Sequence, residues 1–178
     1  TNTDPVKTAR FPKFDWPRIT SPYLGTDDKG QPRPVEQLET MSLKSAEQAF
    51  AAYGADIAAC IVEPIQSEGG DHHFRPEYLQ ALQRITHAHD ALFIVDEVQT
   101  GVGMTGTPWA YQQLGLEPDI VAFGKKTQVC GIMAGGKLDE VPDNVFAVSG
   151  RLNSTWGGGL TDMVRAKHIL AAIETENL

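Results

Sequence analysis

Three short runs of consecutive apolar residues stand out along the chain, and each has the length of a β-strand. They cover residues 57–62, 91–95 and 120–123. An apolar run without polar alternation is typical of a strand in a parallel sheet that helices cover on both faces. We therefore expect these segments to form neighbouring parallel strands. The segment 131–135 is a candidate for one more strand.

Helical patterns occupy the stretches between and around these runs. Residues 35–53 space apolar side chains among polar ones and end before Gly54, a residue type that commonly terminates helices. Pro76 opens a stretch whose apolar positions recur every three or four residues, which indicates a second helix. A short helix is expected within 107–114, and a last one after the glycines at 157–159. This order predicts a three-layer α/β/α fold with a mostly parallel sheet.

The first 34 residues have a different texture, because six prolines interrupt them. Four aromatic residues lie between these prolines: Phe11, Phe14, Trp16 and Tyr23. Proline fixes φ and has no backbone donor, so we expect an irregular segment that its aromatic side chains hold in place. The sequence thus divides into an irregular segment at 1–34, a central α/β part at 35–150 and a terminal part at 151–178.

Composition and charge narrow the possible partners. The 178 residues contain 15 Lys and Arg against 23 Asp and Glu, a net charge of −8, which disfavours nucleic acid and anionic membrane surfaces. No apolar run approaches the roughly 20 residues of a membrane span. Cys60 and Cys130 lie far apart, which argues against a disulfide framework or a cysteine zinc site and suits a reducing cytoplasm. Because the chain lacks an initial Met and stops within a helical pattern, we expect it to be part of a longer protein.

A charged residue follows each of the three apolar runs: Glu63, Asp96 and Lys125. In a parallel sheet the carboxyl ends of the strands share one edge, and ligands bind there. A lysine that is partly desolvated beside other charges is a nucleophile for carbonyl groups. A nearby aspartate keeps a pyridinium nitrogen protonated, which makes pyridoxal phosphate (PLP) an electron sink. Asp96 and Lys125 lie 29 residues apart, the length of one β-α-β unit, so this pair indicates PLP chemistry.

Other patterns give weaker signals. The glycines of GVGMTG at 101–106 match a dinucleotide-binding pattern, but residues 96–100 separate them from the preceding strand, so we interpret them as a glycine-rich loop. A P-loop NTPase needs an upstream G-x-x-x-x-G-K-[ST], and the chain has none. The adjacent His72 and His73 lack a helix-spaced third ligand, so we expect no metal site.

Four ordered segments together resemble the class III, fold-type I PLP-dependent aminotransferases. They are EPIQSEGG (63–70), DEVQTG (96–101), PDIVAFGKK (118–126) and NSTWGG (153–158). The resemblance covers essentially the whole chain and implies the middle of the large, PLP-binding domain. It also implies amino-acid and 2-oxo-acid substrates, and residues 151–178 would supply a phosphate-binding loop at a dimer interface and the start of a helix.

Four further segments are similar to the members of this family that act on L-lysine. They are RFPKFDWPR (10–18), FRPEY (74–78), FGKKTQVCG (123–131) and RLNSTWGG (151–158). The resemblance implies transfer of the ε-amino group of L-lysine to 2-oxoglutarate, which gives 2-aminoadipate 6-semialdehyde and glutamate. An alternative is another ω-aminotransferase of this family, acting on ornithine or 4-aminobutyrate. A third possibility is that the polypeptide alone is an inactive piece with exposed sheet edges.

The resemblance also implies a role for each matching residue. Lys125 would form the internal aldimine with PLP and afterwards carry the proton between the substrate carbon and the cofactor. Asp96 would pair with the pyridinium nitrogen, Val98 would pack on the ring and Gln99 would hydrogen-bond the phenolic oxygen. Thr155 would reach across a homodimer interface to the phosphate of the other subunit's cofactor.

Two acidic residues of the segment 63–70 have implied roles as well. Glu68 would form a salt bridge with an arginine beyond this chain, and this bridge would open to admit 2-oxoglutarate. Glu63 would lie near Asp96. Lys126 follows Lys125 directly, and adjacent residues at a strand end face opposite ways, so only one of the two can reach the ring. We favour Lys125, because the resemblance aligns it without a gap. The family's phosphate-binding glycine/serine loop would lie upstream of Thr1.

Overall fold

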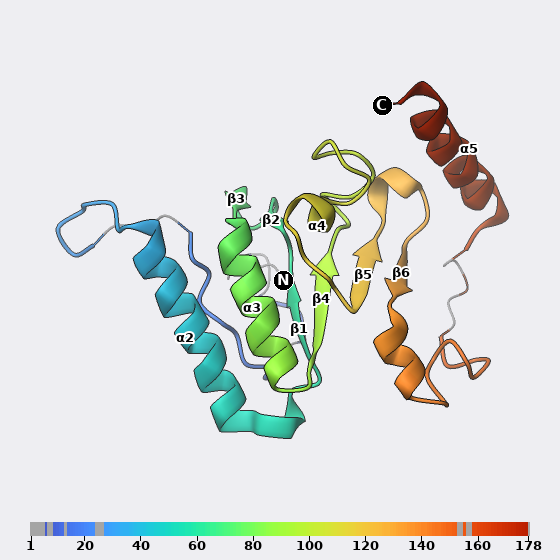
Figure 1. Ribbon diagram of the computed structural model, residues 1–178. Coiled ribbons are helices and arrows are strands. Elements are labelled where there is room, and N and C mark those ends of the chain that lie inside the picture. Colours follow the sequence, from blue (N-terminus) through green and yellow to red (C-terminus); the bar gives the residue numbers. More distant parts are fainter. Residues whose placement is uncertain are drawn as a thin grey trace.

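The computed structural model describes residues 6, 9–12, 14–23, 27–152, 155 and 158–177. At its centre is a four-stranded sheet with the order β1-β4-β5-β6 (Figure 1). The first three strands run parallel and the last runs antiparallel to its neighbour. The strands are β1 (Ala59–Val62), β4 (Leu92–Asp96), β5 (Ile120–Phe123) and β6 (Gly131–Ala134). The three apolar runs therefore form parallel strands as expected, and 131–135 does supply a fourth strand.

The helices also begin and end near the expected positions. The described residues include the α-helices α2 (Val35–Tyr53), α3 (Pro76–Ala88), α4 (Ala110–Gln113) and α5 (Leu160–Glu176). Gly54 ends α2 with a φ of +53°, a conformation that glycine adopts without steric cost. In the part of the chain that the structure describes, no helix combines the length and the apolar character that a membrane span needs.

Short elements complete the fold. A two-stranded antiparallel hairpin, β2 (Ile65–Gln66) and β3 (His72–His73), follows β1. The described part of the chain also contains the 3-10 helices η1 (Gly54–Asp56), η2 (Lys125–Thr127) and η3 (Gly136–Glu140). Of these, η2 matters most for the site, because it begins two residues after the end of β5.

The hydrophobic core lies between the sheet and the helices α2, α3 and α4. Phe93 and Val95 point to this side from β4, and Leu79 and Leu82 meet them from α3; none of these four is exposed. Alternate positions along the strands face the other side of the sheet, because side chains alternate across a strand. On that side Ile61 keeps half of its surface exposed.

Polar contacts join α2 to α3 within and beside this core. The hydroxyl groups of Ser42 and Tyr78 share a buried hydrogen bond of 2.8 Å. Burial raises the pKa of Tyr78 to about 12. Next to them, the guanidinium of Arg75 donates to both carboxylate oxygens of the buried Glu39, at 2.8 and 2.5 Å. The two helices are therefore fixed by polar geometry as well as by apolar packing.

The first segment is irregular where it is described, as expected, and one of its four aromatic side chains holds it to the rest of the fold: Tyr23 stacks on His72, with ring centroids 4.5 Å apart. For Phe11, Phe14 and Trp16 the prediction is wrong, because each exposes about 70% of its surface. Phe14 and Trp16 stack on each other, with ring centroids 4.9 Å apart. Hydrogen bonds also anchor the segment: Thr20 N donates to Ser45 Oγ, and Ser21 Oγ donates to Gln66 Oε1.

Candidate active site

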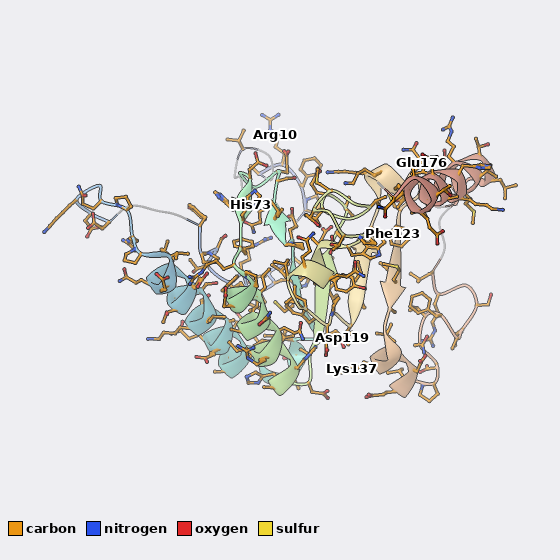
Figure 2. The ribbon with its side chains drawn as sticks, turned by 45° about the horizontal axis from the view of Figure 1, so that its top comes forward. Arg10, His73, Asp119, Phe123, Lys137 and Glu176 are labelled. Carbon is orange, nitrogen blue, oxygen red and sulfur yellow. The ribbon has the colours of Figure 1, made fainter. Side chains whose placement is uncertain are left out.

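The charged residues that follow the apolar runs lie at one edge of the sheet. Glu63 follows β1, Asp96 is the last residue of β4, and Lys125 comes two residues after the end of β5. Because the three strands are parallel, these positions share the carboxyl edge. Figure 2 shows Phe123 at this end of β5 and Asp119 at the opposite end. The predicted placement of the three residues is confirmed.

Lys125 has an unusual backbone. Its φ is +52°, in the left-handed region that costs a residue with a Cβ atom about 1–2 kcal/mol. Such strain persists only where surrounding contacts impose it, and it concentrates at functional sites. The exposed side chain of Lys125 donates from Nζ to Gln99 Oε1 at 2.5 Å. The strained backbone thus presents the amine to the segment that follows β4.

Gly124 lets β5 approach that segment closely. A Cβ atom at Gly124 would lie 2.9 Å from Cys130 Sγ and 3.6 Å from Val98 Cγ1. Val98 in turn donates from its backbone N–H to Asp96 Oδ1 at 3.1 Å. A continuous set of contacts therefore connects the carboxylate of β4 to the residue before Lys125, and only glycine leaves room for it.

Lys126 reaches the same glutamine as Lys125. Its Nζ donates to the backbone carbonyl oxygen of Gln99, whereas Lys125 contacts the Gln99 side chain. The expectation that the two lysines face opposite ways is therefore wrong, because they begin η2 and do not continue a strand. Burial, and then the positive charge of Lys125, lower the pKa of Lys126 from its usual value.

Glu97 is a site residue that the sequence did not reveal. Only 1% of its surface is exposed, and its carboxylate accepts hydrogen bonds from Thr100 Oγ1 and from the backbone N–H groups of Ala110 and Tyr111. These two N–H groups belong to the first turn of α4. A negative charge there is favourable, because helix N-termini carry unpaired donors. Glu97 thus fastens the segment after β4 to α4.

The other residues expected at the site lie on separate segments. Glu63 is half-buried at the end of β1, and Glu68 is exposed in the turn between β2 and β3. Thr155 lies in an exposed bend before α5; its neighbours at 153, 154, 156 and 157 fall outside the described residues, and so does most of NSTWGG. The structure therefore brings Asp96, Val98, Gln99 and Lys125 together, whereas Glu63, Glu68 and Thr155 lie on other segments. The roles expected of all seven residues remain predictions.

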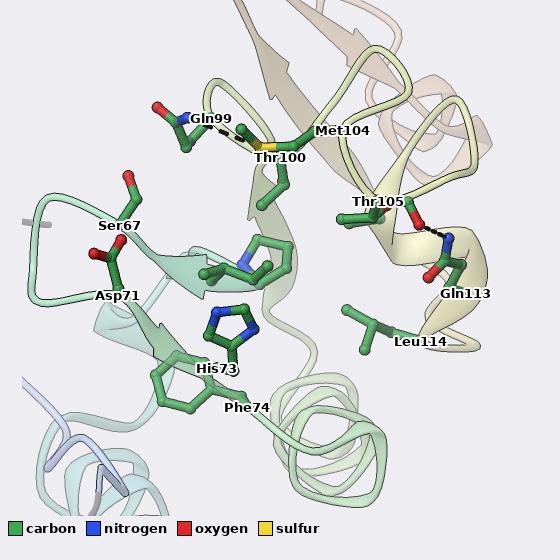
Figure 3. A pocket seen from close by; sticks show the side chains of 13 residues that line it. Ser67, Asp71, His73, Phe74, Gln99, Thr100, Met104, Thr105, Gln113 and Leu114 are labelled. Atoms are coloured by element: carbon green, nitrogen blue, oxygen red, sulfur yellow. Dashed lines mark hydrogen bonds between the residues drawn. The ribbon is translucent and has the colours of Figure 1, made fainter. Parts of the chain in front are cut away.

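A cavity of about 560 Å³ adjoins this site at Gln99 (Figure 3). It lies between the β2–β3 hairpin, the loop that carries Met104 and Thr105, and the helix α4. Gln99 lines it, but Asp96 and Lys125 do not. The cavity is therefore distinct from the place where the charged groups converge, and the chemistry of those groups locates the candidate site.

The glycine-rich stretch at 101–106 forms a loop and not a dinucleotide-binding turn. The strand β4 ends at Asp96, and three residues separate Gly106 from the start of α4. The N–H of Val102 donates to the carbonyl of Pro108 at 2.7 Å, which folds the loop back on itself. A dinucleotide site needs the turn to join strand and helix directly, so this geometry does not fit one. In the described part of the chain, no three His, Cys, Asp or Glu side chains gather as a metal site would require.

Comparison with known proteins agrees with the chemistry of this edge. The sequence pattern of the family described as aminotransferase class-III matches residues 7–178. The chain belongs to the class III aminotransferase family. Enzymes of this family depend on PLP. The fold class expected from the sequence is thereby confirmed as well.

Individual members of the class III family give a finer comparison. The L-lysine-epsilon aminotransferase of Streptomyces clavuligerus is 62% identical over 98% of this chain, and a 4-aminobutyrate aminotransferase of Emericella nidulans is 42% identical over the same share. A solved structure of lysine aminotransferase from M. tuberculosis, in the internal aldimine form, superposes with a TM-score of 0.89 at 61% identity over 99% of this chain. The chain spans 38%, 34% and 40% of these three proteins, respectively.

Proposed function

We propose that the protein containing this chain is a PLP-dependent aminotransferase that moves the ε-amino group of L-lysine to 2-oxoglutarate. The products are 2-aminoadipate 6-semialdehyde and L-glutamate. The observation that carries the proposal is the convergence of Asp96, Gln99 and Lys125 at the carboxyl edge of the sheet. The choice of lysine rests on sequence identity. This chain is 62% identical to an L-lysine-epsilon aminotransferase and 42% identical to a 4-aminobutyrate aminotransferase.

The residues at this edge fit PLP in kind and in order. The ring of PLP carries a basic nitrogen, a phenolic oxygen and an aldehyde. Their partners are a carboxylate, a hydrogen-bond donor and an amine, respectively. Asp96 supplies a carboxylate, Gln99 a side-chain amide and Lys125 an amine that a strained backbone holds in place. The missing Cβ of Gly124 leaves space beside Val98 for close packing.

When bound, PLP supplies an electron sink that stabilises negative charge on the carbon bearing the substrate amine. Asp96 keeps the ring nitrogen protonated through a charge-assisted hydrogen bond, which maintains that sink. Lys125 first holds the cofactor covalently through Nζ. Once free, its amine would accept a proton from the substrate carbon at Nζ and release it again. Gln99 orients the ring by donating from its side-chain amide to the phenolic oxygen.

The remaining expectations belong to this proposal. Glu68, on the turn of the hairpin, pairs with an arginine outside this chain when the lysine substrate binds and releases it when 2-oxoglutarate binds. Glu63 lies close to Asp96 and supports its orientation. Thr155 contacts the phosphate of the cofactor in the second subunit of a homodimer. The protein acts in the cytoplasm. Its segments within this chain are the irregular part at 1–34, the central α/β part at 35–150 and the terminal part at 151–178.

The experiment compares three amino donors with the protein expressed from its complete gene. With 2-oxoglutarate as acceptor, L-lysine gives the highest kcat/KM for glutamate formation, ahead of ornithine and 4-aminobutyrate. A higher value for ornithine or 4-aminobutyrate would replace lysine by that donor and leave the reaction type intact. The isolated 178-residue chain is expected to be inactive; stoichiometric PLP binding and turnover by that chain would contradict this expectation.

A matched pair of lysine variants tests the reaction type itself. Lys125→Ala removes the amine that holds the cofactor and moves the proton, so turnover falls below detection and the absorbance of bound cofactor at roughly 420 nm disappears. Lys44→Ala removes an exposed lysine on α2 and leaves both unchanged. Retention of the band and of turnover in Lys125→Ala would overturn the assignment.

A further inference from the structure

Gln99 is held at two points by two consecutive lysines. Lys125 Nζ donates to its side-chain oxygen, and Lys126 Nζ donates to its main-chain oxygen. The side-chain nitrogen of Gln99 makes a weaker contact, 3.8 Å from Met104 Sδ. The orientation of this amide therefore depends strongly on the two ammonium groups.

The two contacts differ in what the chemistry does to them. In the proposed function, the amine of Lys125 bonds to the cofactor and later moves a proton, so its contact with Gln99 is interrupted during turnover. Lys126 takes no part in those steps. Its contact is with the main chain, so it fixes the position of the residue and not merely one rotamer of its side chain.

The surroundings of Lys126 match such a lasting contact. The side chain is half-buried, so solvent competes less for its ammonium group than on an open surface. The buried carboxylate of Glu97, two residues before Gln99, acts on Lys126 as a favourable charge. Glu97 is itself fixed by donors from Thr100, Ala110 and Tyr111. One end of the Asp96–Gln99 segment is thus fastened by Glu97, and the other is within reach of Lys126.

We propose that Lys126 is a positioning residue that keeps Gln99 on the cofactor while Lys125 is engaged in the reaction. This inference rests on the proposed function. It gives Lys126 a role of its own, whereas the sequence raised only the question of which of the two lysines reaches the ring. Without Lys126, the carbonyl of Gln99 loses a charged donor, and the peptide turns toward water. The side-chain amide then leaves the phenolic oxygen of the ring, although Lys125 still binds the cofactor.

The test uses PLP-bound protein from the complete gene, with Lys126→Met, Lys126→Arg, Gln99→Ala and the Lys126→Met/Gln99→Ala double variant. Met keeps the length of the side chain without a donor, and Arg keeps donor and charge. We expect kcat to fall about tenfold in Lys126→Met, the scale of one lost charge-assisted hydrogen bond, while KM for the amino donor changes less than about twofold. Lys126→Arg recovers most of the loss. Lys44→Met, at an exposed position, is the neutral control.

A spectroscopic readout separates positioning from general damage to the fold. The absorbance maximum of the bound cofactor responds to hydrogen bonding at its phenolic oxygen, so Lys126→Met should show the same shift as Gln99→Ala. The double variant should show no larger loss of kcat than Gln99→Ala alone, because both changes remove one function. If Lys126→Met does not fold, Lys126→Leu, which also lacks a donor, replaces it with the same expectations.

Each other result overturns the proposal. An unshifted absorbance maximum and a kcat within about twofold of wild type in Lys126→Met would show that its contact with Gln99 is incidental. Losses that multiply in the double variant would show that Lys126 acts independently of Gln99, and an equally impaired Lys126→Arg would show that charge and donor do not matter. These failures leave PLP binding by the wild-type protein intact. A wild-type protein that binds no PLP would instead remove the proposed function, and this inference with it.

Discussion

Residues 35–127 and the described residues of 128–177 differ in how far their apolar side chains are buried. In the first region, Leu79, Leu82 and Phe93 are completely buried between α3 and the sheet. In the second, α5 buries only Ala166 among its described residues, while Leu160 exposes 82% and Leu170 exposes 47% of its surface. The first region therefore has a core of its own, whereas packing within this chain contributes little to α5.

The residues of the candidate site follow the same division. The first region contains Asp96, Glu97 and Gln99, and Lys125 lies near its end. The strand that leads to Asp96 is part of the packed core. Thr155 belongs to the second region, where it is exposed. The residues proposed to bind the cofactor ring therefore lie beside a core that this chain forms, while Thr155, proposed to contact the phosphate, is exposed in this chain.

The largest expected effect on folding is in the core of the first region. Leu82→Ala removes a fully buried side chain that packs against Phe93 and Val95, and it should lower the free energy of unfolding by about 3 kcal/mol. Urea denaturation of the protein measures this. A cost below about 1 kcal/mol would mean that the region is not a packed core, and the comparison would break down.

The next effect concerns the buried carboxylate beside the site. Glu97→Ala leaves the N–H groups of Ala110 and Tyr111 without their acceptor, so unfolding should become easier by about 2 kcal/mol. Glu47→Ala, at an exposed position of α2, is the matched control and should change stability by less than about 0.5 kcal/mol. Equal costs for the two variants would show that Glu97 does not hold the segment after β4 to α4.

A pH-dependent effect comes from Tyr78. The folded chain holds its pKa at about 12, against 10.0 for the unfolded state, so the folded state keeps the proton that the unfolded state loses as the pH rises. Stability from this group is present below pH 10 and is lost toward pH 12. At neutral pH, Tyr78→Phe should cost about 1 kcal/mol through the lost contact with Ser42.

This advantage of the wild-type protein over Tyr78→Phe should vanish by about pH 11, because one pH unit between the two pKa values corresponds to roughly 1.4 kcal/mol. Urea denaturation of both proteins between pH 8 and 11 measures the difference. A difference that stays constant over this range would show that Tyr78 is not buried in the way the core requires.

A smaller effect is expected at the boundary between the two regions. Lys125 has a φ of +52°, which glycine adopts freely, so Lys125→Gly should be more stable than Lys125→Ala by about 1 kcal/mol. Both variants lack the amine, so the pair isolates the backbone. Thermal or urea denaturation of the two cofactor-free proteins provides the value, and a more stable alanine variant would argue against the left-handed conformation.

The smallest effect is expected in the second region. Leu170→Ala on α5 should change the free energy of unfolding of this chain by less than about 0.5 kcal/mol, because its side chain is already half exposed. The matched comparison is Leu82→Ala. A cost for Leu170→Ala as large as that of Leu82→Ala would show that another surface covers α5, and the two regions would then not differ.

Local patterns in the sequence were sufficient for the elements of the first region. The run 120–123 and the stretch 35–53 correspond in full to β5 and α2, because apolar periodicity and a terminating glycine are local signals. The alignment of Asp96 and Lys125 at one edge followed from parallel strands alone. The first segment shows the limit, since Phe11 and Trp16 are apolar and yet exposed; whether an aromatic side chain is covered depends on distant parts of the fold.

The details of the site depended on contacts that sequence patterns do not carry. The backbone donors that fix Glu97 come from residues 13 and 14 positions later, and only the folded chain brings them to it. The left-handed backbone of Lys125 is not a local preference of lysine, so tertiary contacts must impose it. The same turn brings Lys126 Nζ to the backbone oxygen of Gln99, whereas alternating side-chain directions were expected at a strand end.

The most direct test of the account is the identity of the lysine that holds the cofactor. Borohydride reduction of the PLP-bound protein fixes the bond permanently, and mass spectrometry of its peptides then locates the added pyridoxyl group. The geometry at the edge of the sheet predicts that Lys125 alone carries it, both in the wild-type protein and in Lys126→Met. A pyridoxyl group on Lys126 or on any other lysine would contradict the account.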